Sequence, residues 1–434
     1  MIAVASAPAA ETQGVEVVDD ILPIDLSGCR FLIYSMNYAP ELTGAGRYTG
    51  EIGAYLARCG ATLEVVTTPP HYPGWTVPAP FKNAFSRSLE GRVGVTHCPL
   101  ALRTEMQGVW RLLAPLSFAL SSAPVVIWRI LALRPHAVLM IEPTLLAAPA
   151  ALIAARLTGA RTLLHVQDLE IDAAFAMGHL RNAFLQRLAA GFEKLTLKAF
   201  DQLVTISNRM RDSLAEKGIH ADRLTVIRNW VDMEKIRPLD GPNAYRAELD
   251  LKPEAFVVLY AGNIGVKQAL DVVLASAAQL ADRDDIVFVI AGDGPEKRKL
   301  VAAAGPNVRF LPLQPENRLC ELLNFADLHV LPQHAGAADL VLPSKLGGML
   351  ASGKSIVVAA DPGTELAEFL EGTATLVPSG DPSALAAAIQ ERASVRNSAP
   401  PQQIEVARTL SSNDALLRFA TLLAGKHATS ASIR

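Results

Sequence analysis

The sequence predicts two doubly wound α/β domains, each built on a parallel sheet, that face each other across a cleft. Short runs rich in Val, Ile and Leu alternate with helix-like segments along most of the chain. This series stops at a polar, proline-rich stretch at residues 236–254 and then begins again. Strands that are buried on both faces of a parallel sheet have this composition and spacing. With 434 residues, the chain is long enough to form two separate cores.

The predicted elements follow one another in a regular order. In the first half the candidate strands are RFLIYSM, TLEVVTT, AVLMIEP, RTLLHVQ and QLVTIS, and helix-like segments such as GEIGAYLARCG and TLLAAPAALIAARLTGA separate them. In the second half they are FVVLYAG, IVFVIAG, VRFLPL, LHVLPQ, SIVVAA and ATLVPS. A late helical segment, PQQIEVARTLSSNDALLRFATLLAG, has no strand after it, so we expect it to pack back across the first domain.

These elements give the following division of the chain. We predict a flexible tail at 1–28, a first Rossmann-like domain at 29–235, a linker at 236–254, a second Rossmann-like domain at 255–400 and a returning helix at 401–425. In open α/β sheets, ligands bind beyond the carboxyl ends of the strands. The loops that follow the predicted strands are therefore the expected places for the functional residues.

Composition excludes several classes of protein. The net charge of −3 does not favour a nucleic-acid partner, which would need a strongly basic surface. Four widely separated cysteines predict reduced thiols rather than disulfides or a structural zinc site. The first twenty residues lack the positive charge and apolar core of a signal peptide, so we expect a cytoplasmic protein.

One apolar stretch has the character of a membrane segment. Residues 112–127 are uncharged, and Arg103, Arg111, Arg129 and Arg134 flank them. The stretch is shorter than the ~20 residues that span a bilayer, and it contains two prolines. It fits either an ordinary buried helix or a helix lying on a membrane surface, where the arginines would meet anionic head groups.

Three glycines follow the first strand, where a phosphate is often bound. A nicotinamide-binding turn needs G-x-G-x-x-G and an acidic residue about 20 positions later. Here Gly44, Gly46 and Gly50 have a different spacing, and Thr67 and Thr68 stand where the acid should be. This excludes a dinucleotide cofactor and leaves either a tight turn or a loop whose amides at Gly44 and Gly46 approach an anionic ligand.

In the second half, two strand ends carry groups suited to a diphosphate. The loop after FVVLYAG holds Gly262, Asn263, Lys267 and Gln268 before a helix begins. Backbone amides, a helix N-terminus and a mobile cation together suit an anionic ligand, although a lone surface lysine is more often only solvated. The next turn, Gly292 to Pro295, is more typical of a structural turn.

A later stretch, DLVLPSKLGGMLASGK, adds a serine and a second lysine. We expect Ser344 to cap a helix that ends near Ser352, with Lys345 at its positive end, where a departing phosphate would be stabilised. Asp339 is a candidate acceptor of hydrogen bonds from sugar hydroxyls. In the first half, LLHVQDLEID ends a strand with His165, Gln167 and Asp168, and a histidine beside an acid at that place is a candidate for binding a polar substrate or sharing a proton.

Seven stretches in this order resemble one family. They are YAPELTGAGRYTGE, TTPPHYPGW, HVQDLEIDAAFAMG, RNWVD, YAGNIGVKQALD, AGDGPEKRKL and DLVLPSKLGGMLASGK. Together they resemble the family 4 glycosyltransferases of GT-B fold, of the type used in colanic-acid and related exopolysaccharide synthesis. The resemblance covers roughly residues 28–425.

The resemblance implies transfer of a sugar from a UDP- or GDP-sugar to an acceptor, with retention at the anomeric carbon and no metal. It implies that the second domain holds the nucleotide and the first faces the acceptor. Carried over by position, Gly46 would lie against the donor diphosphate, His165 would contact the donor sugar, and Pro312 and Leu313 would meet the base. With Lys345, His165 and Asp168 are the candidate catalytic residues.

We predict an acceptor site on the first domain, built from Tyr38, Glu41, His71 and Tyr72. The expected acceptor is a glycan linked to undecaprenyl diphosphate or a similar carrier. The expected location is therefore the inner face of the cytoplasmic membrane, with the protein bound peripherally.

The chain departs from the family pattern at four positions. Asn263 and Gln268 stand where most members have an Arg and a Lys, and Leu340 and Gly348 stand where most have two glutamates. The second glutamate contacts the nucleotide ribose in the family, so this chain is expected to depend more on Lys345. The PSK pattern is shared by a bacterial polysaccharide branch of the family, which favours a variant site over an inactive one.

Other functions stay open at this point. A nucleotide-sugar epimerase of related architecture would need acid and base groups but no acceptor, and a silent membrane-bound assembly partner would fit the missing glutamates. A metal-dependent transferase would use D-x-D to hold a cation. That spelling occurs only at Asp282 to Asp285, on the amino side of a strand, where a solvated turn is expected.

Overall fold

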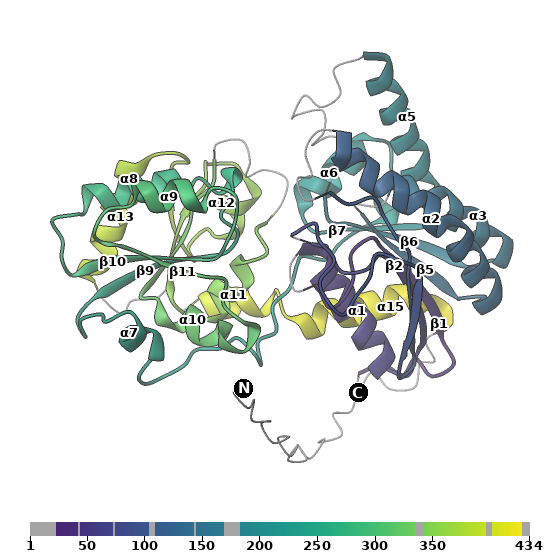
Figure 1. Ribbon diagram of the computed structural model, residues 1–434, viewed down its shortest axis with the longest axis horizontal. Helices are drawn as coiled ribbons and strands as arrows, with labels where there is room; N and C mark the ends of the chain where they lie inside the picture. The colour runs from purple at the N-terminus through teal and green to yellow at the C-terminus, as the bar shows by residue number, and fades with distance from the viewer. Residues whose placement is uncertain are drawn as a thin grey trace, which may run out of the picture.

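The computed structural model describes residues 23–41, 44–72, 74–103, 109–142, 145–168, 183–334, 342–395 and 402–427. Within these residues the chain forms two parallel-sheet domains side by side (Figure 1). The N-terminal 22 residues of the predicted tail lie outside the described part. The prediction of two doubly wound α/β domains is confirmed.

The N-terminal domain is built on an eight-stranded sheet with the order β3-β4-β2-β1-β5-β6-β7-β8. Its strands are β1 (Arg30–Tyr34), β2 (Thr62–Thr67), β3 (Ser86–Glu90), β4 (Val93–His97), β5 (Ala137–Glu142), β6 (Arg161–Val166), β7 (Gln202–Thr205) and β8 (Leu224–Val226). Its helices are α1 (Gly44–Arg58), α2 (Val109–Leu133), α3 (Ala148–Thr158) after the short turn η1 (Leu145–Ala147), α5 (Ala183–Ala199) and α6 (Asn208–Glu216). Only β3 runs antiparallel, in a hairpin with β4.

The C-terminal domain is built on a six-stranded parallel sheet with the order β11-β10-β9-β12-β13-β14. Its strands are β9 (Phe256–Ala261), β10 (Ile286–Ala291), β11 (Val308–Leu311), β12 (Leu328–Leu331), β13 (Ser355–Ala359) and β14 (Thr375–Val377). Its helices are α7 (Ala244–Glu248), α8 (Leu270–Gln279), α9 (Lys297–Ala303), α10 (Leu319–Phe325), α11 (Leu346–Ala351), α12 (Glu365–Phe369), α13 (Pro382–Ser394) and α14 (Gln403–Arg408). These six strands coincide with the six apolar runs that predicted them.

Apart from the exposed edge strand β3, the strands are largely apolar on both faces, and helices cover both faces of each sheet. In the N-terminal domain, one face packs against α2, α3, α5 and α6. The other face packs against α1 and against α15 (Ser412–Ala424), which returns from the end of the chain. Helix α15 runs along the underside of the first sheet in Figure 1. Each domain therefore has its own core.

The chain crosses between the domains twice, and the two crossings lie together. Trp230 belongs to the N-terminal core and Val231 to the C-terminal core. The backbone of Val231 pairs with Leu410 and Ser412, at 2.8 and 2.9 Å. The first crossing is therefore earlier than the predicted boundary at residue 235, because the apolar side chain of Val231 already packs under the second sheet.

The predicted linker at 236–254 is also more ordered than its composition suggested. It contains helix α7, whose Tyr245 is fully buried against Phe325 in the C-terminal domain. In the same way, α14 packs against α11 of the C-terminal domain, and only α15 packs on the first domain. The returning segment is thus shared by the two domains.

Candidate functional site

The loops that were expected to bind a ligand follow β1, β9 and β12. In each sheet the strand order reverses beside one of these strands, with β1 between β2 and β5 and β9 between β10 and β12. Such reversals leave room for ligands beyond the carboxyl ends of the strands. The three loops therefore lie where this fold places its binding sites.

In the C-terminal domain, the loop after β9 faces Lys345. Gly262 has a φ of +151°, which L side chains rarely adopt, and a Cβ there would lie 3.4 Å from Cδ of Lys345. The Lys345 ammonium lies 4.0 Å from the centroid of the Tyr260 ring. The Tyr260 hydroxyl donates a hydrogen bond of 2.6 Å to the carbonyl of Asn263, which fixes the loop.

Lys345 has no carboxylate partner among its described contacts, and its surroundings shift its titration. Removal of water from the amine lowers the pKa of Lys345 from its ordinary value to about 7. The Tyr260 ring provides only a cation–π contact in compensation. An anionic ligand at this position would restore the charge, so the arrangement suits a diphosphate.

The segment around Ser344 differs from the prediction in one respect. Helix α11 spans only Leu346–Ala351, Lys345 occupies its N-cap position, and no side chain caps it. Ser344 instead faces the hydroxyl of Tyr48, which belongs to α1 of the other domain. Ser344 of the PSK motif therefore lies against the first turns of α1.

The remaining polar residues of the β9 loop are accessible. Asn263 and Lys267 are exposed and Gln268 is partly exposed, in the loop and the short turn η3 (Val266–Gln268) before α8. The turn from Gly292 to Pro295 lies directly beneath this loop, because a Cβ at Gly292 would meet the carbonyl oxygen of Gly262. This close packing agrees with a structural role for the turn, which stays a prediction.

In the N-terminal domain the prediction of a glycine loop is corrected, because Gly44, Gly46 and Gly50 all lie in α1, where the protein's own side chains pack against them. A Cβ at Gly46 would lie 2.6 Å from Oε2 and 2.8 Å from Cβ of Glu41. Gly50 is constrained in the same way by Ala39, whose Cβ would lie 2.8 Å away. Gly44 has a φ of +62° and lies against the ring of Tyr72. Gly46 is thus required first for packing against Glu41.

Glu41 joins two loops of the predicted acceptor site. Its Oε1 accepts hydrogen bonds from the backbone amides of His71 and Tyr72, at 2.9 and 3.0 Å, and its Oε2 accepts one from Asn37, at 2.8 Å. Glu41 and His71 are buried, and Tyr38 is buried against α1. Only Tyr72, at 43% exposure, presents its side chain to solvent. The other three residues therefore position loops rather than contact an acceptor directly.

His71 is neutral and closely held. Burial lowers the pKa of His71, and this outweighs the nearby Glu41 carboxylate, which acts in the opposite direction. Its Nδ1 lies 3.1 Å from both the Thr68 hydroxyl and the Pro69 carbonyl oxygen. Thr68 in turn donates a hydrogen bond of 2.6 Å to the carbonyl of Met36. Thr68, which stands where dinucleotide-binding folds have an acidic residue, therefore belongs to the hydrogen bonds that hold this loop.

His165 does not reach the surface where a donor sugar would bind. It lies within β6, has no exposed surface, and its ring packs against Phe419 of α15 with a centroid distance of 4.8 Å. Burial lowers the pKa of His165 to about 3, so the imidazole is neutral. The prediction of a direct contact with the sugar is corrected, because side chains alternate along a strand and this one points to the α15 side.

The polar group beyond the end of β6 is Gln167, which the sequence placed at this strand end but which was not among the candidate catalytic or donor-binding residues. Its amide nitrogen lies 3.1 Å from Nε2 of His165, and Gln167 and Asn229 exchange two hydrogen bonds of 3.0 and 3.1 Å. Asp168 is exposed at the same strand end.

Five further positions that the sequence singled out have mixed outcomes. Pro312 and Leu313 follow β11 and are exposed, and the Pro312 carbonyl accepts a hydrogen bond of 2.9 Å from Gln314. Asp339 and Leu340 lie outside the described residues. Gly348 lies in α11, where a Cβ would come within 3.0 Å of Leu323, so a glutamate there would require repacking.

The domains are also joined away from these loops. The Glu365 carboxylate of α12 accepts hydrogen bonds from the amides of Asn208 and Arg209, both at 2.8 Å, and from Arg228, at 3.0 Å. The two amides form the N-terminus of α6, which favours a negative charge. Glu365 thus fastens the C-terminal domain to a loop at the carboxyl end of β7.

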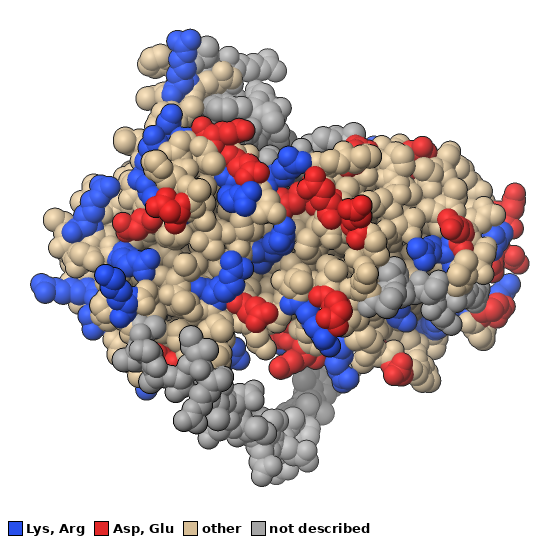
Figure 2. Space-filling model, turned by 180° about the vertical axis from the view of Figure 1, so that it is seen from behind, with Lys and Arg blue, Asp and Glu red and all other residues tan. Residues whose placement is uncertain are grey.

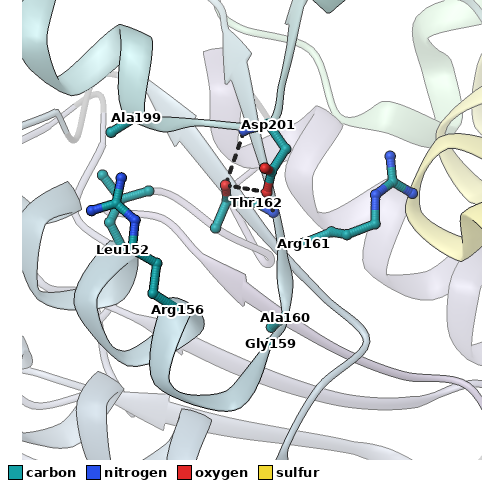
Figure 3. Close-up of a pocket in the computed structure, with 8 residues that line it drawn as sticks. All are labelled: Leu152, Arg156, Gly159, Ala160, Arg161, Thr162, Ala199 and Asp201. Atoms are coloured by element: carbon teal, nitrogen blue, oxygen red, sulfur yellow. Dashed lines mark hydrogen bonds between the residues drawn. The ribbon is translucent and has the colours of Figure 1, made fainter.

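A separate pocket of about 270 Å³ lies at the opposite edge of the N-terminal sheet (Figure 3). Leu152 and Arg156 of α3 line it together with Thr162 and Asp201, which hydrogen-bond to each other at 2.8 Å. The side chain of Arg161 points away from it toward α15. The pocket lies near the amino ends of β6 and β7, so it is not part of the site described above.

No group of three or more His, Cys, Asp or Glu side chains that could hold a metal ion occurs among the described residues. The D-x-D spelling lies just before β10, where Arg283 forms an ion pair of 2.8 Å with Asp285. Independence from metal stays a prediction.

Comparisons with known proteins agree with this architecture. Residues 43–230 match the model of a glycosyl transferase 4-like domain, and residues 255–394 match that of glycosyl transferases group 1. The chain is 37% identical over 375 residues to the putative colanic acid biosynthesis glycosyl transferase WcaI of Escherichia coli K12, covering 83% of this chain and 91% of the relative. The chain belongs to the family 4 glycosyltransferases.

Solved structures show the same GT-B fold for this glycosyltransferase. Sucrose-phosphate synthase from Thermosynechococcus elongatus aligns with a TM-score of 0.72 at 16% identity, covering 92% of this chain and 99% of that one. WaaG, a glycosyltransferase involved in lipopolysaccharide biosynthesis, aligns with a TM-score of 0.63 at 14% identity, covering 92% and 100%. Anabaena HepE, solved with UDP and glucose, aligns with a TM-score of 0.62 at 16% identity, covering 91% and 99%.

Proposed function

We propose that this glycosyltransferase moves a sugar, with retention, from a UDP- or GDP-sugar to a lipid-linked glycan in the synthesis of an exopolysaccharide. The observation that carries the proposal is Lys345, a lysine with a lowered pKa that faces the glycine loop after β9. The relative WcaI is named for colanic acid biosynthesis, and HepE binds UDP. Both names support a nucleotide-sugar donor and a polysaccharide product.

The residues suggest how the reaction proceeds. The bond between the anomeric carbon and the diphosphate oxygen breaks while the acceptor hydroxyl bonds to the same face of that carbon. The hydroxyl proton passes to the departing phosphate oxygen, and a nucleoside diphosphate leaves. Lys345, Lys267 and the amides near Gly262 stabilise the negative charge that develops on the leaving group. No side chain is assigned as a covalent nucleophile.

We also propose that the protein acts peripherally on the inner face of the cytoplasmic membrane, on an acceptor carried by undecaprenyl diphosphate. Helix α2 supports this location. Its segment Leu113–Leu133 has a mean hydropathy of 1.7 and is long and apolar enough to cross a membrane by length and composition, yet only 22% of it is buried. Its inner side belongs to the core of the domain, which favours contact with a membrane surface over a crossing.

A panel of UDP-, GDP- and dTDP-sugars in a thermal-shift assay tests the donor. A ligand that binds only the folded state at about 100 times its Kd adds about 2.7 kcal/mol of stability. We expect one nucleotide class to raise the Tm, in the presence of a chelator as well as without it. Proton NMR of the product made with that donor then tests retention, and no shift with any donor would refute the proposal.

A further inference from the structure

The exposed apolar side chains of this protein gather on one group of helices. More than half of the large apolar residues that are exposed in the described part lie on α2, on η1 with α3, and on α5. Leu120 on α2, Leu157 on α3 and Leu195 on α5 are 70%, 72% and 73% exposed. Contiguous apolar surface of this kind marks a site of interaction.

The pattern along α2 shows that this exposure is systematic. Every fourth residue from Ala114 to Ile130 is buried in the domain core. On the opposite side Leu116, Leu120 and Trp128 are exposed, at the same spacing of four or eight residues. A surface helix of a globular protein normally carries polar residues on its outer side. Helix α2 is apolar on both sides, but only one side packs into the core of the domain.

The outer sides of the three helices face the same way. Phe118 of α2, Ala151 of α3 and Leu197 of α5 belong to one core cluster on one face of the N-terminal sheet. The other face is covered by α1 and α15. Figure 1 shows α2, α3 and α5 together on the side of the N-terminal domain away from α1 and α15. Residues opposite their core contacts therefore form one outward face.

The charges on this face have one sign. Helices α2 and α3 contain no Asp or Glu, and α5 contains only Glu193, which is buried and paired with Lys217 at 2.7 Å. Exposed basic side chains remain, namely Arg156, Arg187, Lys194 and Lys198. In Figure 2 basic side chains line the projecting part of the N-terminal domain that holds α5.

We propose that the outer sides of α2, α3 and α5 form a docking face for a lipid bilayer that contains anionic lipids. Leucines enter the acyl region, Trp128 lies at the head-group level, and the basic residues meet lipid phosphates. A second copy of this chain does not fit the face, because a symmetric contact would bring these basic residues together with no exposed carboxylate from these helices to neutralise them. The inference rests on the proposed function, since it defines how the enzyme meets a lipid-linked acceptor.

Vesicle flotation of the full chain tests this face. Wild-type protein is expected to float with vesicles of phosphatidylcholine and phosphatidylglycerol, and far less with phosphatidylcholine alone. A triple variant with Leu120→Glu, Leu157→Glu and Leu195→Glu is expected to lose at least about tenfold in partitioning. The matched control, Val301→Glu with Val395→Glu, changes exposed valines of the C-terminal domain and is expected to float like wild type.

Two further measurements decide how a failure is interpreted. Arg187→Gln with Lys194→Gln and Lys198→Gln is expected to lose the preference for anionic vesicles while it keeps its fold. The donor-induced thermal shift of each variant is expected to equal that of wild type, so a missing shift would refute the proposed function rather than the docking face. Wild-type flotation of the leucine variant would overturn the proposal. So would a wild-type dimer that the same variant dissociates, because the face would then bind a second copy.

Discussion

The segments around Gly46 and Gly262 look alike in sequence but have different surroundings in the structure. In the N-terminal domain, the space above Gly46 of α1 is filled by Glu41, whose carboxylate accepts hydrogen bonds from Asn37 and from the amides of His71 and Tyr72. In the C-terminal domain, Gly262 faces Lys345, a half-buried lysine whose pKa is lowered by desolvation and which has no carboxylate partner among the described residues. The space at Gly46 is therefore filled by the protein itself, whereas Lys345 beside Gly262 has no counter-charge among the described residues.

The difference teaches which loop depends on a ligand. A glycine that makes room for a neighbouring side chain contributes to folding stability, and its replacement acts on the folded state. A glycine beside a poorly hydrated lysine contributes to the binding of an anion. The predictions below separate these two roles.

Lys345→Ala has the largest expected effect. Removing a cation that stabilises the leaving group lowers kcat by about 10²–10³-fold. The Tm is expected to stay the same or to rise, because a poorly solvated amine is removed. Steady-state kinetics with the donor identified by thermal shift measure the effect. The exposed Lys299→Ala on α9 is the control, and equal losses in both variants would contradict the role of Lys345.

Gly46→Ala is expected to act mainly on stability. The added Cβ would lie 2.6 Å from a carboxylate oxygen and 2.8 Å from Cβ of Glu41, so the loop must move. Overpacking of this kind costs about 1–3 kcal/mol, which corresponds to a fall in Tm of about 2–12 °C for a domain of this size. Gly191→Ala in α5 is the matched control, because a Cβ there meets nothing within 4 Å. An unchanged Tm with weakened donor binding would show instead that Gly46 faces the donor.

The sequence predicted the fold well where the signals were local. All six strands of the C-terminal sheet coincide with runs of apolar residues, because strands buried on both faces have few alternatives. The β3–β4 hairpin and β8 were not predicted. Strand β3 includes exposed polar residues such as Arg87 and Ser88, and β8 has only three residues, so neither has a strong apolar pattern.

The site was predicted less completely, because its contacts depend on distant parts of the chain. Lys345 and Gly262 were identified from their loops, but no local pattern shows that Tyr260 lies under the amine. His165 was assigned to the sugar although its orientation is set by α15, more than 250 residues later. The contact of Glu365 with α6 joins residues 157 positions apart and could not be predicted from either segment.

The pH dependence of donor binding sharpens the role of Lys345. Its pKa in the free protein is about 7, and a bound diphosphate is expected to raise that value because it favours the charged amine. Binding above pH 7 therefore takes up a proton, and the Kd is expected to rise about tenfold per pH unit between pH 7 and the pKa of the complex. Below pH 7 the amine is already charged, so the Kd is expected to be constant. Titration calorimetry measures both the Kd and the proton uptake.

Lys345→Arg is the control for this pH profile. The guanidinium stays charged over the same range, so donor binding by the variant is expected to be independent of pH even where it is weaker. The same slope in the variant and in wild type would assign the titration to another group.

The smallest expected effect belongs to Glu365. Its replacement tests whether the contact between Glu365 and α6 helps to hold the two domains in place. Glu365→Gln replaces one acceptor oxygen by an NH₂ group, which can only donate. That group would face one of the present donors, which are the amides of Asn208 and Arg209 and the guanidinium of Arg228. Hydrogen bonds to a charged acceptor are worth about 1.5–3 kcal/mol, so the arrangement of the domains is expected to loosen. Small-angle scattering would show a larger radius of gyration without donor, and the KM for donor would rise a few-fold while Tm changes little.

Glu368→Gln is the control, because that carboxylate is 65% exposed and lies 3.8 Å from Arg209. Equal scattering curves for wild type and Glu365→Gln would show that Glu365 is not needed to hold the two domains in their arrangement.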